Sequence, residues 1–270
     1  MTELISLLSP QINAHLSGFA FYAALVVLGG GIGLLTGLFG VGGGFLTVPL
    51  MNVLIGVPYA LAVGSDLSMI VGTSTAGVLR HRRSKTVHFA TALWIGGGSI
   101  IGAVLGDVIQ DLARLRVGDT GFTLTMHGLF VVLLIGAVIL TVHRTNNRAQ
   151  EARQANARIP SVLLTLIGLG VGLLTGIMGI GGGVLLVPIL LAVVGLPERT
   201  AAGTSLAIVF LSATVGTIKK TVSSVAKVSM PITLSLLISG VIGVQIGSAL
   251  GQRLPGAQFR RYYVWVLAVA

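Results

Sequence analysis

Residues 33–50 read GLLTGLFGVGGGFLTVPL, and residues 172–189 read GLLTGIMGIGGGVLLVPI. The two stretches align without a gap at an offset of 139 residues, and twelve of their eighteen positions are identical. A shorter pair follows at the same offset, AVGSDL at 62–67 and AAGTSL at 201–206. The chain is therefore an internal duplication, and its functional site is expected where the two copies meet.

The composition indicates a polytopic membrane protein. Only 9% of the residues are charged and 54% are hydrophobic, with a mean hydropathy of +0.98, which is typical of a chain that lies in a bilayer. Four runs carry no Asp, Glu, Lys or Arg and reach or approach the roughly 20 residues that a spanning helix needs: 120–142, 159–197, 200–218 and 228–252. These runs are continuously apolar, which favours an all-α fold over a barrel of alternating strands.

Charge and residue content exclude several function classes. The net charge of +10 comes from Lys and Arg that lie mostly in short connectors between apolar runs, which indicates membrane topology and no nucleic-acid partner. The chain has no Cys and five scattered His, so we expect no metal site and no cofactor. No nucleophile or carboxylate pair converges at one depth, which argues against an enzyme. A multi-pass protein of the bacterial inner membrane is the expected class.

The duplication predicts about eight transmembrane segments in two parallel four-helix repeats, each with a glycine-broken first helix. An N-terminal segment covers 1–18, the first repeat 19–143, a basic cytoplasmic linker 144–158, and the second repeat 159–270, whose last helix looks truncated. The basic loops at 80–85, 144–158 and 219–227 are each separated by two predicted spans. The positive-inside rule therefore places all three loops, and the N-terminus, in the cytoplasm, with the repeats related by an axis along the membrane normal.

The glycine clusters are the predicted site. As one straight helix, the 39 uncharged residues at 159–197 would extend roughly 58 Å, against a hydrocarbon core of about 30 Å. Consecutive glycines followed by Pro49 or Pro188 favour a break, and a helix that restarts there presents free amides and a dipole to an anion. Close helix packing is the alternative role for these glycines. The predicted substrate contacts in the two clusters are Gly42, Gly43, Gly44, Gly181, Gly182 and Gly183.

Polar residues behind each cluster complete the prediction. The hydroxyls of Ser65, Thr204 and Ser205 are expected to donate to the anion, with bonding to the carbonyl one turn earlier as the alternative. Asp66 aligns with Ser205, and an acid in a spanning helix indicates a proton carrier or a gate, or else a structural hydrogen bond to a neighbouring helix end. Arg80 and Lys219 occupy aligned positions, where they either draw anions inward or only fix topology.

The third helices of the two halves carry small residues at a spacing of four. Such stripes let helix backbones approach closely, so packing is the expected role. The two stripes are Gly98, Gly102 and Gly106, and Ser239, Gly243, Gly247 and Gly251.

The paired glycine stretches and their AVGSDL and AAGTSL partners resemble the sulfite exporter TauE/SafE family of bacterial membrane permeases. The resemblance covers about 31–251 and implies an inner-membrane carrier of seven or eight helices for sulfite, organosulfonates or other small anions. We therefore expect a secondary transporter, permease or exporter of a small sulfur oxyanion, working by alternating access between the repeats. A channel-like or structural subunit that acts with a partner protein is the alternative. Homo-oligomers, the coupling ion and the direction of transport stay open.

Overall fold

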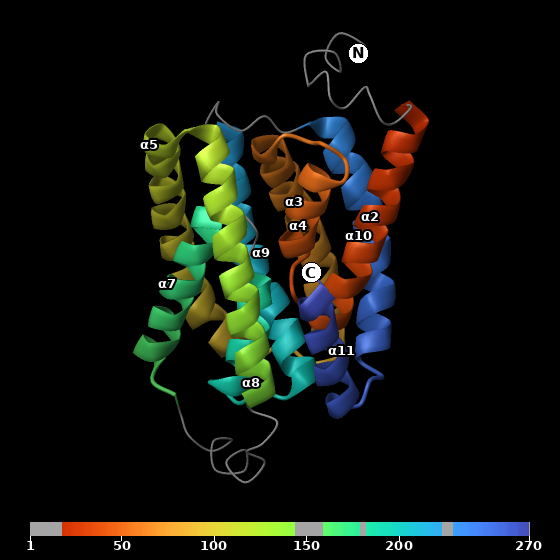
Figure 1. Cartoon of the computed structure of the whole chain (residues 1–270). Coiled ribbons are helices and arrows are strands. Elements are labelled where there is room, and N and C mark those ends of the chain that lie inside the picture. Colours follow the sequence, from red (N-terminus) through yellow and green to blue (C-terminus); the bar gives the residue numbers. More distant parts are fainter. Residues whose placement is uncertain (1–17, 144–158, 179–181, 223–228, 270) are drawn as a thin grey trace.

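The computed structural model describes residues 18–143, 159–178, 182–222 and 229–269, and the described residues are helical with short connectors and no strand. The predicted all-α class is therefore confirmed. The helices in chain order are α2 (Gly18–Phe39), α3 (Gly44–Val53), α4 (Tyr59–Arg83), α5 (Phe89–His143), α7 (Ser161–Met178), α8 (Gly183–Ala192), α9 (Glu198–Val222), α10 (Met230–Gly251) and α11 (Gly256–Val269) (Figure 1).

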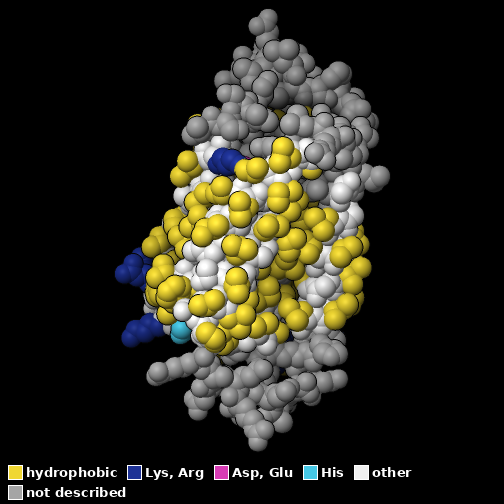
Figure 2. All heavy atoms as spheres, turned by 90° about the vertical axis from the view of Figure 1, so that its left-hand side faces the viewer, with side chains coloured by type: hydrophobic (Ala, Val, Ile, Leu, Met, Phe, Trp, Pro, Cys, Tyr) yellow, Lys and Arg dark blue, Asp and Glu magenta, His cyan; other side chains and the backbone are white. Residues whose placement is uncertain are grey.

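Six described helices are long and apolar enough to cross a membrane, where the sequence predicted about eight spans. They are α2, α4, the first part of α5, α7, α9 and α10, while Gly44–Val53, Val131–Thr141 and Gly183–Ala192 are shorter apolar helices. Large hydrophobic side chains point outward from the long helices, for example Leu93, Val162 and Leu166, which are 69%, 68% and 58% exposed. Figure 2 shows such side chains over much of one face, as expected of a surface that contacts lipid.

Helix α5 turns back on itself. A straight helix of its 55 residues would be about 82 Å long, yet both of its ends lie near the start of α9. The His88 amide donates to the Thr204 hydroxyl at 2.9 Å, and Thr141 lines a cavity together with Glu198. In Figure 1 the ribbon of α5 reverses at the top of the view, so its first and last parts run in opposite directions.

The stripes of small residues pack helices against each other, as predicted. A side chain at Gly98, Gly102 or Gly106 would meet the backbone of α7, at Thr165, Leu169 and Leu173 respectively. Side chains at the α10 glycines would likewise meet the α2 backbone, from Gly30 to Leu38. In both helix pairs the contacting residue numbers rise together along the two helices. Helix α5 therefore runs parallel to α7 in this region, and α10 runs parallel to α2.

The helix pairings show that the two halves have opposite orientations. Helix α4 runs antiparallel to α9, because Leu67 contacts Gly216 whereas Leu206 contacts Gly77. Helix α4 also runs parallel to α10, since Gly240 contacts Met69 and Gln245 bonds to Ala76 further along. Helices α2, α4 and α10 therefore point one way, and α7, α9 and the first part of α5 point the other way. Each of these three helices of the first half thus runs opposite to its counterpart in the second.

The prediction of parallel repeats is therefore wrong, and the reason lies at the first glycine break. Gly40 packs against Ala202, but Gly42 packs against Val209, seven residues further along α9. Because α9 runs antiparallel to α2, the chain has reversed between these glycines, and α3 returns toward the side from which α2 came. From the sequence alone, the residues of α2 and α3 were predicted to make one crossing. A reversal in place of a crossing inverts the second half, as in transporters whose pseudo-twofold axis lies in the membrane plane.

The inversion separates two of the predicted cytoplasmic loops. Arg80 and Arg82 lie in the last turn of α4 and Lys219 lies near the end of α9, and these helices are antiparallel. Arg82 and Lys219 therefore lie at opposite ends of the bundle, so the predicted common side of the loops that begin at 80 and 219 is wrong. Because the basic residues at 80–85 and 253–261 flank the Arg82 end, we expect that end to face the cytoplasm and Gly18 to lie outside.

Cysteine labelling tests this topology in a chain without native Cys. We expect a membrane-impermeant maleimide to label Thr221→Cys in intact cells and to label Arg82→Cys only after permeabilisation, because the two exposed positions lie at opposite ends. Labelling of both variants from the same side would contradict the inverted arrangement.

Candidate functional site

Each glycine break ends one helix and starts a short one. Helix α3 begins at Gly44 after Gly42 and Gly43, with φ of +74° and +54°, and α8 begins at Gly183 after Gly182, with φ of +62°. These backbone conformations favour glycine, so both predicted breaks are confirmed. The amides of Gly42, Gly43 and Phe45 donate no backbone hydrogen bond to another described residue. The N-terminus of α3 therefore presents free donors together with the positive end of its dipole. Gly181 lies outside the described residues.

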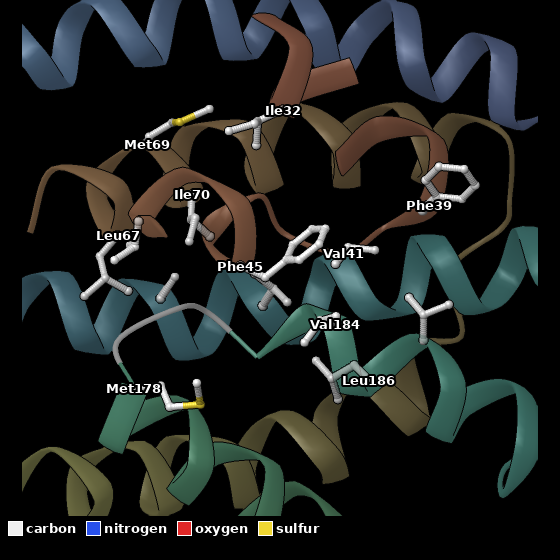
Figure 3. Packing of buried hydrophobic residues seen from close by; sticks show 14 of the residues in the cluster. Ile32, Phe39, Val41, Phe45, Leu67, Met69, Ile70, Met178, Val184 and Leu186 are labelled. Carbon is white, nitrogen blue, oxygen red and sulfur yellow. The ribbon is translucent and has the colours of Figure 1, made fainter. Parts of the chain in front are cut away.

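The two breaks meet in the centre of the bundle. A Cβ at Gly183 would overlap the carbonyl group of Val41, so the two copies are in backbone contact there. Figure 3 shows Val41 and Phe45 from the first copy and Val184 and Leu186 from the second within one buried cluster. Val41, Gly42 and Gly183 therefore lie at the interface between the halves, which is where the duplication predicted the site.

Three polar side chains, those of Thr36, Thr47 and Asp66, lie beside the backbone of Gly43 at the first break. We call these four residues the Asp66 cluster. The Thr47 hydroxyl lies beside the Asp66 carboxyl but donates to the Gly43 carbonyl at 3.1 Å. The Thr36 hydroxyl faces Gly43, 3.2 Å from where a Cβ would be. Thr36 and Asp66 are buried, and neither side chain has a hydrogen bond of normal geometry to a described residue.

A buried carboxyl without a hydrogen-bond partner is costly in a membrane interior. The Thr47 hydroxyl in the first turn of α3, a neighbouring helix end, lies beside the carboxyl group, although neither carboxyl oxygen has a hydrogen bond of normal geometry to a described residue. Amides without a backbone acceptor lie at the same turn. The roles of Asp66 as proton carrier, gate or structural group stay predictions.

The second break lacks this cluster. Leu186 occupies the position equivalent to Thr47, and Ser205 the position equivalent to Asp66. Thr175, equivalent to Thr36, donates to the Val171 carbonyl at 2.7 Å. The pseudo-symmetric pair of breaks therefore carries only one acid.

The structure does not bring all the predicted hydroxyls together. Asp66 lies near the level of Gly216 on α9, whereas Ser205 lies near the level of Gly77 on α4, roughly 17 Å apart along the helix pair at 1.5 Å per residue. Ser65 lies next to Asp66, toward the same end of α4. The buried hydroxyls of Ser65 and Ser205 have no partner among the described residues. The Thr204 hydroxyl accepts a hydrogen bond from the His88 amide. This is a structural role, at the end of the α4 and α9 pair that lies away from Asp66.

Helix α11 holds the start of α8 in place. Pro188 has no amide hydrogen, so the carbonyl of Val184 one turn earlier lacks its usual helical partner. The buried Tyr263 hydroxyl donates to this carbonyl at 2.8 Å, and the Tyr263 ring packs against Phe39 at the end of α2, with centroids 5.6 Å apart. An unpaired buried carbonyl costs about 1–3 kcal/mol, so α11 stabilises both glycine breaks.

Three contributors, Thr36, Thr47 and Tyr263, were not predicted from the sequence, although the sequence contains a signal for the first two. Thr36 lies in the repeated GLLTG one turn before the break, and Thr47 is a polar residue where the other copy has Leu186. Pro188 implies an orphan carbonyl and hence a donor, but nothing in the sequence indicates that Tyr263 supplies it. No group of three or more potential metal ligands occurs in the described part of the chain.

Comparison with known proteins identifies the family of the chain. The family model described as sulfite exporter TauE/SafE matches residues 24–270. The chain belongs to the TauE/SafE family. It is a multi-pass membrane protein of a transporter family, consistent with the bacterial inner membrane.

Curated relatives of this TauE/SafE protein carry matching descriptions. The probable membrane transporter protein YjnA of Bacillus subtilis is 31% identical over 238 residues, which cover 85% of this chain and 90% of the relative. YunE of the same organism, also described as a probable membrane transporter, is 27% identical over 246 residues, or 86% and 89% of the two chains. A probable membrane transporter of Methanocaldococcus jannaschii is 24% identical over 257 residues, or 91% and 92%. No solved structure matches the chain.

Proposed function

We propose that the protein is a proton-coupled secondary transporter of a small anion, a sulfur oxyanion or organosulfonate, which binds where the two glycine breaks meet. The observation that carries this proposal is the backbone contact between Val41 and Gly183 at the interface of two inverted halves. Inverted repeats of this kind support alternating access by movement of one half against the other around a central site. The matched family description, sulfite exporter, supports the sulfur oxyanion as substrate class.

The chemistry of the central site follows from its donors. Amides at the start of α3 and the hydroxyls of Thr36 and Thr47 bind an oxyanion without a charged side chain. The Asp66 carboxylate competes for the same donors and repels the anion. Protonation of Asp66 removes both effects, so anion and proton bind together. Because the second break has Ser205 in place of an acid, one proton accompanies each anion.

Flux into proteoliposomes tests this function. Purified protein is expected to move sulfite, sulfoacetate or isethionate, and an inward proton gradient should increase the initial rate. Sulfonates are the better probes because they stay ionised over the tested pH range and leak little as neutral acids. Sulfate, acetate and protein-free vesicles provide the comparison. If no anion moves under any gradient while the protein remains monodisperse, the proposal fails and a subunit that needs a partner protein is favoured.

A further inference from the structure

The pseudo-twofold relation reveals an asymmetry at the two ends of the bundle. The third helices correspond at an offset of 141, because Ala103 contacts Gly176 as Val244 contacts Gly37. Asp107 therefore corresponds to Ser248, while Lys219 corresponds to Arg80 at the offset of 139. Lys219 forms an ion pair with Asp107 across 2.6 Å. At the other end of the bundle the equivalent cation, Arg80, faces a position that carries no acid.

Contacts between α4 and α10 place Ser248 at the level of Arg80. Gln245 donates to the Ala76 carbonyl at 3.4 Å, and the Ser84 hydroxyl donates to the Gln252 side chain at 2.8 Å. Arg80 lies midway between Ala76 and Ser84, and Ser248 lies between the two glutamines. The Ser248 hydroxyl, the Gln252 amide nitrogen and Arg80 Nε are buried without a hydrogen-bond partner among the described residues.

A cavity of about 330 Å³ occupies this end, lined by Leu79, Arg80, Arg83, Ser84 and Gln245. The acids whose side chains are described all lie elsewhere. Asp107 pairs with Lys219, Glu198 pairs with Arg260 at 3.3 Å, and Asp66 belongs to the central cluster. The cavity therefore collects positive charge and hydrogen-bond donors that no described residue neutralises.

We propose that this cavity, which we call the Arg80 vestibule, binds a free small oxyanion of the sulfonate or sulfite type in the place that the Asp107 carboxylate fills at the opposite end. The guanidinium group of Arg80 is suited to two parallel hydrogen bonds with an oxyanion, and Ser84 and Gln245 supply neutral polar groups. The vestibule rests on the proposed function for its role, which is to collect the anion before it moves to the central site.

Cysteine modification measures anion binding here without any transport. In a Ser84→Cys variant of the full chain in phosphatidylcholine vesicles, the rate of modification by the anionic 2-sulfonatoethyl methanethiosulfonate is compared with that of its cationic trimethylammonium analogue. We expect the ratio of anionic to cationic rates to fall about fivefold to tenfold when Arg80→Gln is added, because one nearby unit charge is lost. Arg80→Lys keeps the charge and should keep most of the ratio. Isethionate should protect the introduced thiol only when residue 80 is basic.

Three outcomes would overturn the vestibule. An unchanged ratio in Arg80→Gln would show that Arg80 attracts no anion, and lack of protection by isethionate would show that a sulfonate does not bind. Protection that appears only after phosphatidylglycerol is added would assign the cavity to a lipid headgroup. Because the readout is chemical modification, this test can be carried out even if the protein shows no flux. If the protein transports the anion but isethionate does not protect the thiol at position 84, the vestibule is disproved and the proposed function is not. The matched control is Lys219→Gln, which removes a cation at the opposite end and should leave the ratio of modification rates at position 84 unchanged.

Discussion

Replacing Gly183 by alanine is expected to lower the initial rate of anion transport at least tenfold and to destabilise the protein by about 1–3 kcal/mol. Gly183 is the first residue of α8 and has no positive φ, so alanine suits its backbone conformation. The added methyl group would, however, overlap the backbone of Val41. Backbone atoms cannot move aside as a flexible side chain does, so the two halves must separate at the central site.

The control for this substitution is Gly170→Ala in the preceding helix, α7. A Cβ at Gly170 meets no atom within 4 Å, so this variant adds the same methyl group without a clash and should keep wild-type flux. Flux into proteoliposomes at matched protein amounts and the midpoint of thermal unfolding in detergent measure the two effects. Wild-type flux together with an unchanged midpoint in Gly183→Ala would contradict the contact between the breaks.

The sequence predicted the parts of the fold that depend on local chemistry. Repeated glycines identified both breaks, because few other residues adopt the positive φ seen at Gly42 and Gly182. Small residues at a spacing of four predicted close helix packing at the α10 stripe, although not that α2 is its partner. Both features are properties of a short stretch of chain, and the residue types alone are sufficient to indicate them.

The relative orientation of the halves could not be predicted in the same way. A glycine break permits either a kink or a reversal, and the contacts of Gly40 and Gly42 with α9 decide between them. Those contacts join residues about 160 positions apart in the chain, at 40 and 202. Reading α2 and α3 as one crossing inverted the second half, which moved Lys219 to the wrong side and placed Ser205 beside Asp66. The expected single cluster of hydroxyls was a consequence of that error.

Replacing Asp66 by asparagine is expected to abolish the stimulation of flux by a proton gradient, so that the ratio of flux with the gradient to flux without it falls to about one. Asparagine has nearly the shape of the buried Asp66 side chain but cannot ionise. The central site then resembles the state with a protonated acid, which binds the anion without taking up a proton. Exchange of external for internal anion should therefore continue, since exchange needs no net proton movement.

Glu198→Gln is the matched control, because it removes another carboxylate whose partner is Arg260, away from the central cluster. This variant should keep the gradient response, whereas Asp66→Asn should lose it at every external pH tested. Measuring exchange and gradient-driven uptake on the same vesicles separates loss of coupling from loss of folding, because an unfolded variant would show neither. A gradient response in Asp66→Asn equal to that of the wild type would remove Asp66 as the proton site. The other buried hydroxyls near the central site that have no partner among the described residues, Thr36 and Ser65, do not ionise near neutral pH, so neither could then replace it.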